Sequence, residues 1–228
     1  MRQAAIYADT EALASAAAAY LTDQIITCIG QKGRCHIALP GGTTPGRCLE
    51  LVSSQPLPWH NIHVYLGDER CYPVAHAERN DTMIVQKLWS RIDAPADNFH
   101  PIPAELGPEL AAQRYTGLIN ELGYLDIVLL GMGEDGHTAS LFPGNAAVTD
   151  ERAAVPVYDA PKPPKERVSL GMVSLQKAGQ RIVLVTGANK HDALTRVEQG
   201  DTLPISLIGE AHWFIDQAAA LGQAEDST

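Results

Sequence analysis

The stretch LDIVLLGMGEDGHTASLFPG, residues 125–144, runs from a nearly continuous apolar segment into a glycine-rich loop. The apolar part, 125–130, has the length and composition of a β-strand that is covered on both faces. Similar runs predict further strands at residues 35–39, 61–66, 181–186 and 204–208. Periodic patterns predict helices at about residues 10–29, 45–54, 80–91, 108–122 and 188–199. This alternation predicts an α/β fold with a mostly parallel sheet and helices on both faces.

Local signals indicate where the first two helices begin and end. Thr10 is expected to cap the first helix and Gly30 to end it. Thr44 is expected to cap the second helix, with Pro45 at its first position. Residues 160–167, APKPPKER, are expected to form a rigid, extended loop, because a strand-like segment follows at once.

No internal repeat or flexible linker divides the chain. We therefore expect a single domain over residues 1–228, with a frayed tail at 222–228. The oligomeric state does not follow from the sequence, and a monomer is the default expectation. The cysteines contain no C-x-x-C pair, and buried, reduced thiols are expected at Cys28, Cys35, Cys48 and Cys71.

Composition and charge restrict the classes of partner. The chain is 45% hydrophobic and 19% charged, which is ordinary for a soluble globular protein, and its formal net charge is −10. Non-specific binding to nucleic acid or to an anionic membrane needs basic patches, so neither partner is expected. Asp9 and Glu11 precede the Ala-rich run near the start, which argues against a signal peptide. We expect no segment of the ~20 apolar residues that span a bilayer, and hence a cytoplasmic protein.

The loops after two of the predicted strands could hold an anion. Gly41, Gly42 and Thr43 follow strand 35–39, where backbone amides and a helix dipole suit a phosphate group. A plain tight turn would have the same residues. Lys190 follows strand 181–186 in the first turn of a predicted helix, where a cation opposes the helix dipole unless both share an anion. A solvated lysine is the alternative.

Strand 61–66 runs into Asp68, Glu69 and Arg70, which places three charges at a sheet edge beside apolar residues. Taken alone, these residues favour a solvated charged turn. In an open α/β sheet, however, ligands bind outside the carboxyl ends of the strands, where this segment lies with the other loops described here.

The glycine-rich loop 131–144 is compatible with three kinds of site. Its G-x-G-x-x-G would suit a dinucleotide, but Pro143 stops any long helix after it, and this interpretation fails. A metal site is not expected either, because His137 has only Asp135 close by. A histidine two residues after an aspartate that can orient it fits general base catalysis. Ser140 is a weak candidate nucleophile, since no G-x-S-x-G motif surrounds it.

Taken together, these motifs resemble the 6-phosphogluconolactonase family. The resemblance covers nearly the whole chain and is carried by ALPGGTTP, VYLGDERCYP, DIVLLGMGEDGHTASLFPG, APKPPKERVSL and VTGANK. It implies a Rossmann-like, three-layer α/β/α sandwich. It also implies hydrolysis of 6-phospho-D-glucono-1,5-lactone to 6-phosphogluconate, the second step of the pentose phosphate pathway, without a cofactor or a metal.

The resemblance also implies roles for particular residues. His137 corresponds to the general base, Asp135 to its support and Arg70 to a cation near the reacting lactone. The substrate, and its phosphate group above all, would be held by Gly41, Gly42, Thr43, Asp68, Arg167 and Lys190. One departure is Arg79, which precedes Asn80 where a small residue is expected.

Two alternatives share this scaffold. An amino-sugar phosphate isomerase/deaminase would continue its D-E motif with an aromatic residue, whereas Arg70 stands here. A non-catalytic sugar-phosphate sensor would have lost His137 or Arg70, or gained a DNA-binding segment.

Overall fold

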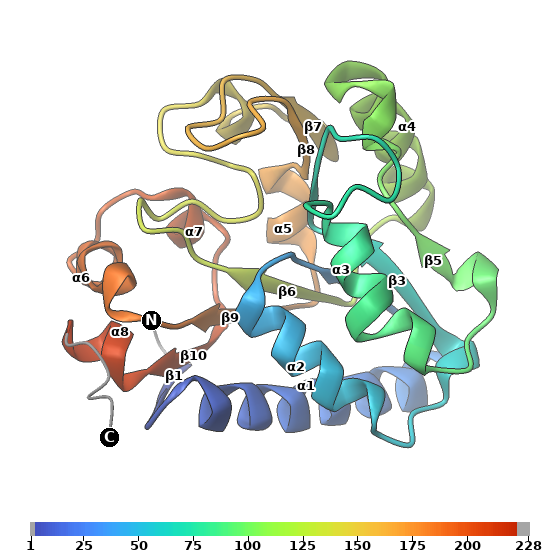
Figure 1. The fold of residues 1–228 in the computed structure, drawn as a ribbon, viewed down its shortest axis with the longest axis horizontal. Coiled ribbons are helices and arrows are strands. Elements are labelled where there is room, and N and C mark those ends of the chain that lie inside the picture. Colours follow the sequence, from blue (N-terminus) through green and yellow to red (C-terminus); the bar gives the residue numbers. More distant parts are fainter. Residues whose placement is uncertain (1–2, 223–228) are drawn as a thin grey trace.

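The computed structural model describes residues 3–222 and is built on a parallel, seven-stranded sheet (Figure 1). The strand order is β1-β10-β9-β6-β2-β3-β5. These strands are β1 (Gln3–Tyr7), β2 (Cys35–Leu39), β3 (Ile62–Leu66), β5 (Phe99–His100), β6 (Ile127–Gly131), β9 (Gln180–Val185) and β10 (His212–Asp216). The almost uninterrupted apolar runs of β2, β6 and β9 fit their central position, where helices cover both faces.

Helices lie on both sides of this sheet. In Figure 1, α1 and α2 pack together on one side, while α4 and α5 lie on the other. The helices are α1 (Thr10–Lys32), α2 (Thr43–Ser53), α3 (Asn80–Lys87), α4 (Pro108–Leu122), α5 (Met172–Lys177), α6 (His191–Glu198), α7 (Pro204–Leu207) and α8 (Gln217–Leu221). The expected α/β/α sandwich is confirmed.

A second, smaller sheet extends the carboxyl end of β3. It consists of β4 (Asp68–Arg70), β8 (Arg167–Leu170) and β7 (Ala154–Val157), all antiparallel. Gly67 separates β3 from β4, so the charged D-E-R segment is a strand of its own. The pairing places Arg70 directly opposite Arg167, two residues far apart in the sequence.

Helix α1 is longer than the sequence pattern indicated. Its N-cap is Asp9, whose side chain accepts from Ala12 N, and it ends at Gly33 with φ +77° rather than at Gly30. By length and composition alone, the 23-residue helix could cross a membrane, which corrects the expectation that no segment reached that length. One face of the helix is buried in the core through Leu13, Ala14, Ala17, Ala18, Leu21 and Ile25.

The predicted strand at 204–208 is wrong. Pro204 begins the short helix α7, and Ser206 Oγ accepts a hydrogen bond of 3.0 Å from Leu203 N, which favours a helical turn. The strand next to β9 is instead β10, formed by His212–Asp216.

Several element boundaries also differ from the predicted ones. Helix α2 begins at Thr43 with Gly42 as its N-cap, so neither Thr44 as the cap nor Pro45 as the first residue is correct. Lys190 closes a 3₁₀ turn immediately before α6 rather than lying within it. Cys71 is only half-buried, whereas the other three cysteines are buried, and all four are free thiols. The tail 223–228 lies outside the described residues.

Candidate active site

The sheet has a topological switch point between β2 and β6, because β3 and β5 lie on one side of this pair and β9 and β10 lie on the other. Open parallel sheets bind ligands at such a point, beyond the carboxyl ends of the strands. A cleft of about 420 Å³ lies there. Of the predicted site residues, its walls contain Gly41, Gly42, Thr43, Asp68, Arg70, His137, Arg167 and Lys190. Asp135, the remaining one, contacts the imidazole of His137.

His137 and Asp135 form a short, oriented pair. His137 Nδ1 lies 2.6 Å from Asp135 Oδ1, and the backbone N–H of His137 donates to the same oxygen at 3.0 Å. Burial would raise the pKa of Asp135, but the hydrogen bonds and the charge of His137 outweigh it and lower that pKa to about 2. Asp135 is therefore a carboxylate at neutral pH. With Nδ1 held in this way, Nε2 is the imidazole nitrogen that can act on a ligand.

Gly133 leaves room for this pair. A Cβ atom at Gly133 would lie 2.0 Å from His137 Nδ1 and 2.7 Å from Asp135 Oδ1, so a side chain there would displace the imidazole. The imidazole ring also contacts Phe142, with 4.4 Å between the ring centroids. Residues of its own loop thus confine the imidazole.

Asp68 is held by two side chains from other segments. Ser140 Oγ donates to Asp68 Oδ2 at 2.5 Å, and Asn80 Nδ2 donates to Asp68 Oδ1 at 3.0 Å. Ser140 is fully buried, so it serves as a hydrogen-bond donor rather than as an accessible nucleophile. Asp68 itself is 5% exposed and belongs to the wall of the cleft.

Asn80 also limits the glycine loop after β2. A Cβ atom at Gly41 would lie 1.9 Å from Asn80 Oδ1, so only glycine allows this close approach of the loop to α3. Gly42 adopts φ +105°, which L side chains rarely adopt. The loop is further fixed where Thr44 Oγ1 meets Thr186 Oγ1 at 2.7 Å, across the β2 and β9 ends.

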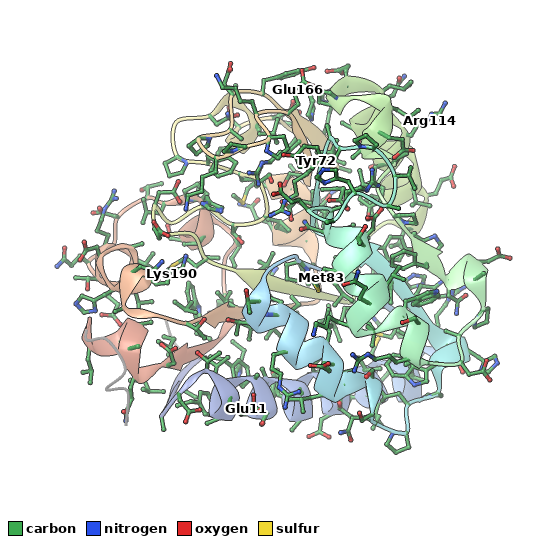
Figure 2. All side chains as sticks on the ribbon, viewed as in Figure 1. Glu11, Tyr72, Met83, Arg114, Glu166 and Lys190 are labelled. Atoms are coloured by element: carbon green, nitrogen blue, oxygen red, sulfur yellow. The ribbon has the colours of Figure 1, made fainter. Side chains whose placement is uncertain are left out.

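Three cations and one carboxylate line the cleft, in a chain whose net charge is −10. The cations are Arg70, Arg167 and Lys190, and the carboxylate is Asp68. Lys190, labelled in Figure 2, is half-buried, and burial lowers its pKa although Glu134 opposes the shift. Burial also lowers the pKa of Arg167, and the like charge of Arg70 contributes while Asp68 opposes it. Desolvated cations of this kind favour an anionic ligand.

The two arginines are anchored differently. Arg167 donates from Nε and Nη2 to the carbonyls of Pro164, Lys162 and Pro163, and it lies over the ring of Phe142. Arg70 Nη1 donates to the carbonyl of Glu78, whereas its Nε is buried without a partner among residues 3–222.

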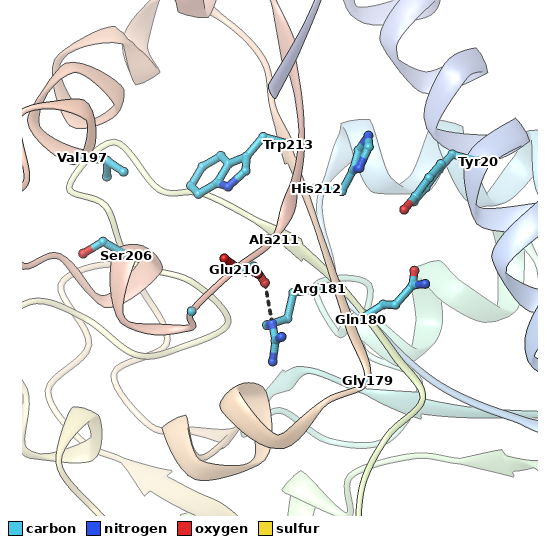
Figure 3. A pocket seen from close by; sticks show the side chains of 11 residues that line it. Tyr20, Gly179, Gln180, Arg181, Val197, Ser206, Glu210, Ala211, His212 and Trp213 are labelled. Carbon is cyan, nitrogen blue, oxygen red and sulfur yellow. Dashed lines mark hydrogen bonds between the residues drawn. The ribbon is translucent and has the colours of Figure 1, made fainter. Parts of the chain in front are cut away.

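A larger cavity, of about 770 Å³, opens at the amino ends of β9 and β10, away from these loops (Figure 3). Trp213 and Tyr20 line it, together with Arg181, whose guanidinium donates to the carbonyls of Glu210, Leu175, Gln176 and Ala178. Because Arg181 is already used to bind backbone oxygens, this cavity is a poorer anion site than the cleft at the carboxyl ends.

Sequence reasoning missed two contributors to the cleft. Asn80 contacts both Asp68 and the Gly41 loop, and Phe142 connects His137 to Arg167. Asn80 stands at the start of a predicted helix, which was its only local signal. The role of Phe142 depends on contacts between distant segments.

The fold agrees with comparisons against known proteins. The chain belongs to the family of glucosamine-6-phosphate isomerases and 6-phosphogluconolactonases, whose model matches residues 8–215. It is 36% identical over 227 residues to the 6-phosphogluconolactonase of Nostoc sp., covering 92% of this chain and 94% of that relative. It is 33% identical to the 6-phosphogluconolactonase of Mycobacterium leprae, covering 94% and 96% of the two chains.

Solved structures show the same relationship. The 6-phosphogluconolactonase of Thermotoga maritima superposes with a TM-score of 0.88 at 26% identity, covering 94% of this chain and 99% of that one. A monomeric glucosamine-6-phosphate deaminase reaches a TM-score of 0.85 at 20% identity, covering 97% and 100%. At that identity the second likeness shows a common fold only.

Proposed function

We propose that the chain hydrolyses 6-phospho-D-glucono-1,5-lactone to 6-phosphogluconate in the cytoplasm, the second step of the pentose phosphate pathway. The observation that carries this proposal is the His137–Asp135 pair, 2.6 Å between Nδ1 and Oδ1, in a cleft with three cations. Relatives named 6-phosphogluconolactonase, at 36% and 33% identity over most of the chain, support the choice of substrate.

In the proposed reaction, His137 Nε2 takes a proton from a water molecule as the water oxygen attacks C1 of the lactone. General base catalysis of this kind typically contributes roughly 10²–10⁴-fold. The C1 carbonyl oxygen gains negative charge, which the guanidinium of Arg70 would stabilise in the transition state. The bond from C1 to the ring oxygen then breaks, and the imidazolium returns its proton to that oxygen. Neither a covalent intermediate nor a cofactor is needed, because a lactone is already an activated ester.

The phosphate group at C6 takes no part in the bond changes but would hold C1 in place. Gly41, Gly42 and Thr43 offer backbone amides at the start of α2, and Lys190 lies on the same cleft. Asp68, fixed by Ser140, would accept a hydrogen bond from a hydroxyl group of the sugar. Arg167 would add positive charge to the cleft that receives the phosphate group.

The test is the rate at which the lactone disappears, with the lactone generated in place from glucose 6-phosphate. The purified protein is expected to accelerate this loss far above spontaneous hydrolysis. A rate equal to the spontaneous one would contradict the proposal. Release of ammonia from glucosamine 6-phosphate would favour the deaminase alternative, and tight binding of 6-phosphogluconate without turnover would favour a sensor.

A further inference from the structure

Glu69 ties the strand that carries Arg70 to the start of α3. Its side chain is fully buried, and Oε1 accepts from the backbone N–H groups of Arg70 at 2.8 Å and Asn80 at 2.7 Å. Its Oε2 accepts from Asp81 N at 2.8 Å. Asn80 and Asp81 begin α3, whose own N-cap residue, Arg79, provides no side-chain cap. Glu69 therefore caps this helix from β4, which no local sequence pattern reveals.

Arg79 is the cation beside this buried carboxylate. Its Nε lies 3.9 Å from Glu69 Oε2, and its side chain is 2% exposed. The guanidinium also binds Asp81 at 2.6 Å and Glu105 at 3.1 Å. A buried charge without a partner is strongly unfavourable, so Arg79 compensates a cluster of three carboxylates.

Arg79 also fixes the loop that anchors the guanidinium of Arg70. Its Nη1 donates to the carbonyl of Tyr72 at 2.9 Å and its Nη2 to that of Ile102 at 3.2 Å. Tyr72, labelled in Figure 2, lies at the start of this loop, and Glu78, whose carbonyl accepts from Arg70 Nη1, lies at its end. Arg79 thus binds the start of this loop, and Arg70 binds its end.

We propose that Arg79 is a positioning residue, which neutralises Glu69 and thereby sets the places of Arg70 and Asn80 in the cleft. The role of Arg79 in catalysis rests on the proposed lactone hydrolysis, whereas the ordering of Arg70 does not. Arg79 touches none of the reacting atoms in this scheme. It acts through Glu69 and through the loop that ends at Glu78.

The proposal implies an unusual pH dependence. Burial raises the pKa of Glu69 to about 7, against three backbone hydrogen bonds that lower it, and the charge of Asp81 raises it further. Three other ionisable groups interact with Glu69. They are Arg79, the thiol of Cys71 directly after β4, and the buried phenol of Tyr115 on α4. With a pKa of about 7, Glu69 of the wild type is already partly protonated at neutral pH. Loss of the Arg79 charge would raise this pKa further, so the protonated form, whose oxygens accept N–H bonds more weakly, would predominate at pH 7.

The experiment compares Arg79→Met with Arg79→Lys and with a matched control, Arg152→Met. Arg152 is an arginine bound to an aspartate two residues away, Asp150, and to a glutamate, Glu109, but it lies outside the cleft. We expect Arg79→Met to lower kcat/KM at pH 7 by about 10- to 100-fold, since small misplacements of catalytic groups have effects of this order. The loss should shrink at about pH 9, where Glu69 is ionised again. Arg79→Lys should recover part of the activity, and Arg152→Met should match the wild type.

A substrate-independent signal separates this proposal from the lactonase assignment. The buried Nε–H of Arg70 should give a slowly exchanging ¹⁵N–¹H resonance, identified by its loss in Arg70→Lys. We expect the resonance to shift or broaden in Arg79→Met and to persist in Arg152→Met. If the wild type does not hydrolyse the lactone but the resonance changes in Arg79→Met and persists in Arg152→Met, only the lactonase function is contradicted. An unchanged resonance, or a wild-type kcat/KM of Arg79→Met at every pH, would overturn the positioning role.

If Arg79→Met does not fold, Glu69→Gln/Arg79→Met removes both charges of the pair. This double variant should fold better than Arg79→Met, because it removes the cost of burying Glu69 without its cation, either as an unpaired carboxylate or as an acid that must first take up a proton. Its activity should be reduced but without the additional loss near neutral pH, since Glu69 is no longer there to titrate. The same pH-dependent loss in the double variant would show that another group is responsible.

Discussion

Replacing Asp135 with asparagine removes a negative charge from the His137 imidazole while it keeps the size and shape of the side chain. As a general base the imidazole is neutral before it takes a proton from water and positively charged afterwards. Asp135, 2.6 Å from Nδ1, therefore stabilises the transition state more than the bound substrate. Asp135→Asn should lower kcat and leave KM nearly unchanged.

The expected size follows from the kind of bond that is lost. Hydrogen bonds to charged groups contribute about 1.5–3 kcal/mol, and each 1.4 kcal/mol corresponds to a factor of about 10 in rate. The fall in kcat should thus be about 10- to 150-fold, and smaller than the fall caused by removing His137 itself.

Proton release with a pH indicator follows the reaction, because opening of the lactone produces a carboxylic acid. Asp201→Asn is the control, since Asp201 forms an exposed ion pair with Arg196 outside the cleft. A kcat of Asp135→Asn within twofold of the wild type would refute the reasoning. A large rise in KM at constant kcat would do the same, because it would make Asp135 a substrate-binding residue.

Further predictions concern the anion site and the fit of the loops. Lys190→Met should raise KM by about 10- to 150-fold with little change in kcat, because the phosphate group loses a charge-assisted bond. The control Lys162→Met, which removes an exposed ion pair with Glu134, should leave KM unchanged. A lower kcat at unchanged KM would count against the phosphate role of Lys190. Gly133→Ala should reduce kcat at least as much as Asp135→Asn, since its methyl group would meet His137 Nδ1. Gly117→Ala, outside the cleft and with no atom within 4 Å of its Cβ, should keep most of the activity. Equal kcat values for the two alanine variants would argue that the imidazole tolerates displacement.

Much of the fold follows from local patterns. Helix α4 occupies the predicted residues 108–122, where Pro108 and Gly123 mark its two ends. Strand β2 also has its predicted bounds. The failure at 204–208 arose because a short apolar run fits a strand and a helical turn equally well, and a contact between Ser206 and Leu203 decides between them.

The candidate site is predictable only in part for a related reason. His137 and Asp135 are two residues apart, so their pairing was visible in the sequence. The contacts of Asp68 with Ser140, and of Glu69 with Asn80, join segments that only the folded chain brings together. Arg79 stood out as a departure, but its role in compensating buried carboxylates depends on burial, which the sequence does not encode locally.

The most direct test of the central claim is the steady-state kinetics of His137→Ala beside the wild type, with the lactone generated in place. We expect kcat to fall by roughly 10²–10⁴-fold while KM changes by much less, because His137 takes the proton from water and does not hold the phosphate group. A kcat of His137→Ala equal to that of the wild type would contradict the account.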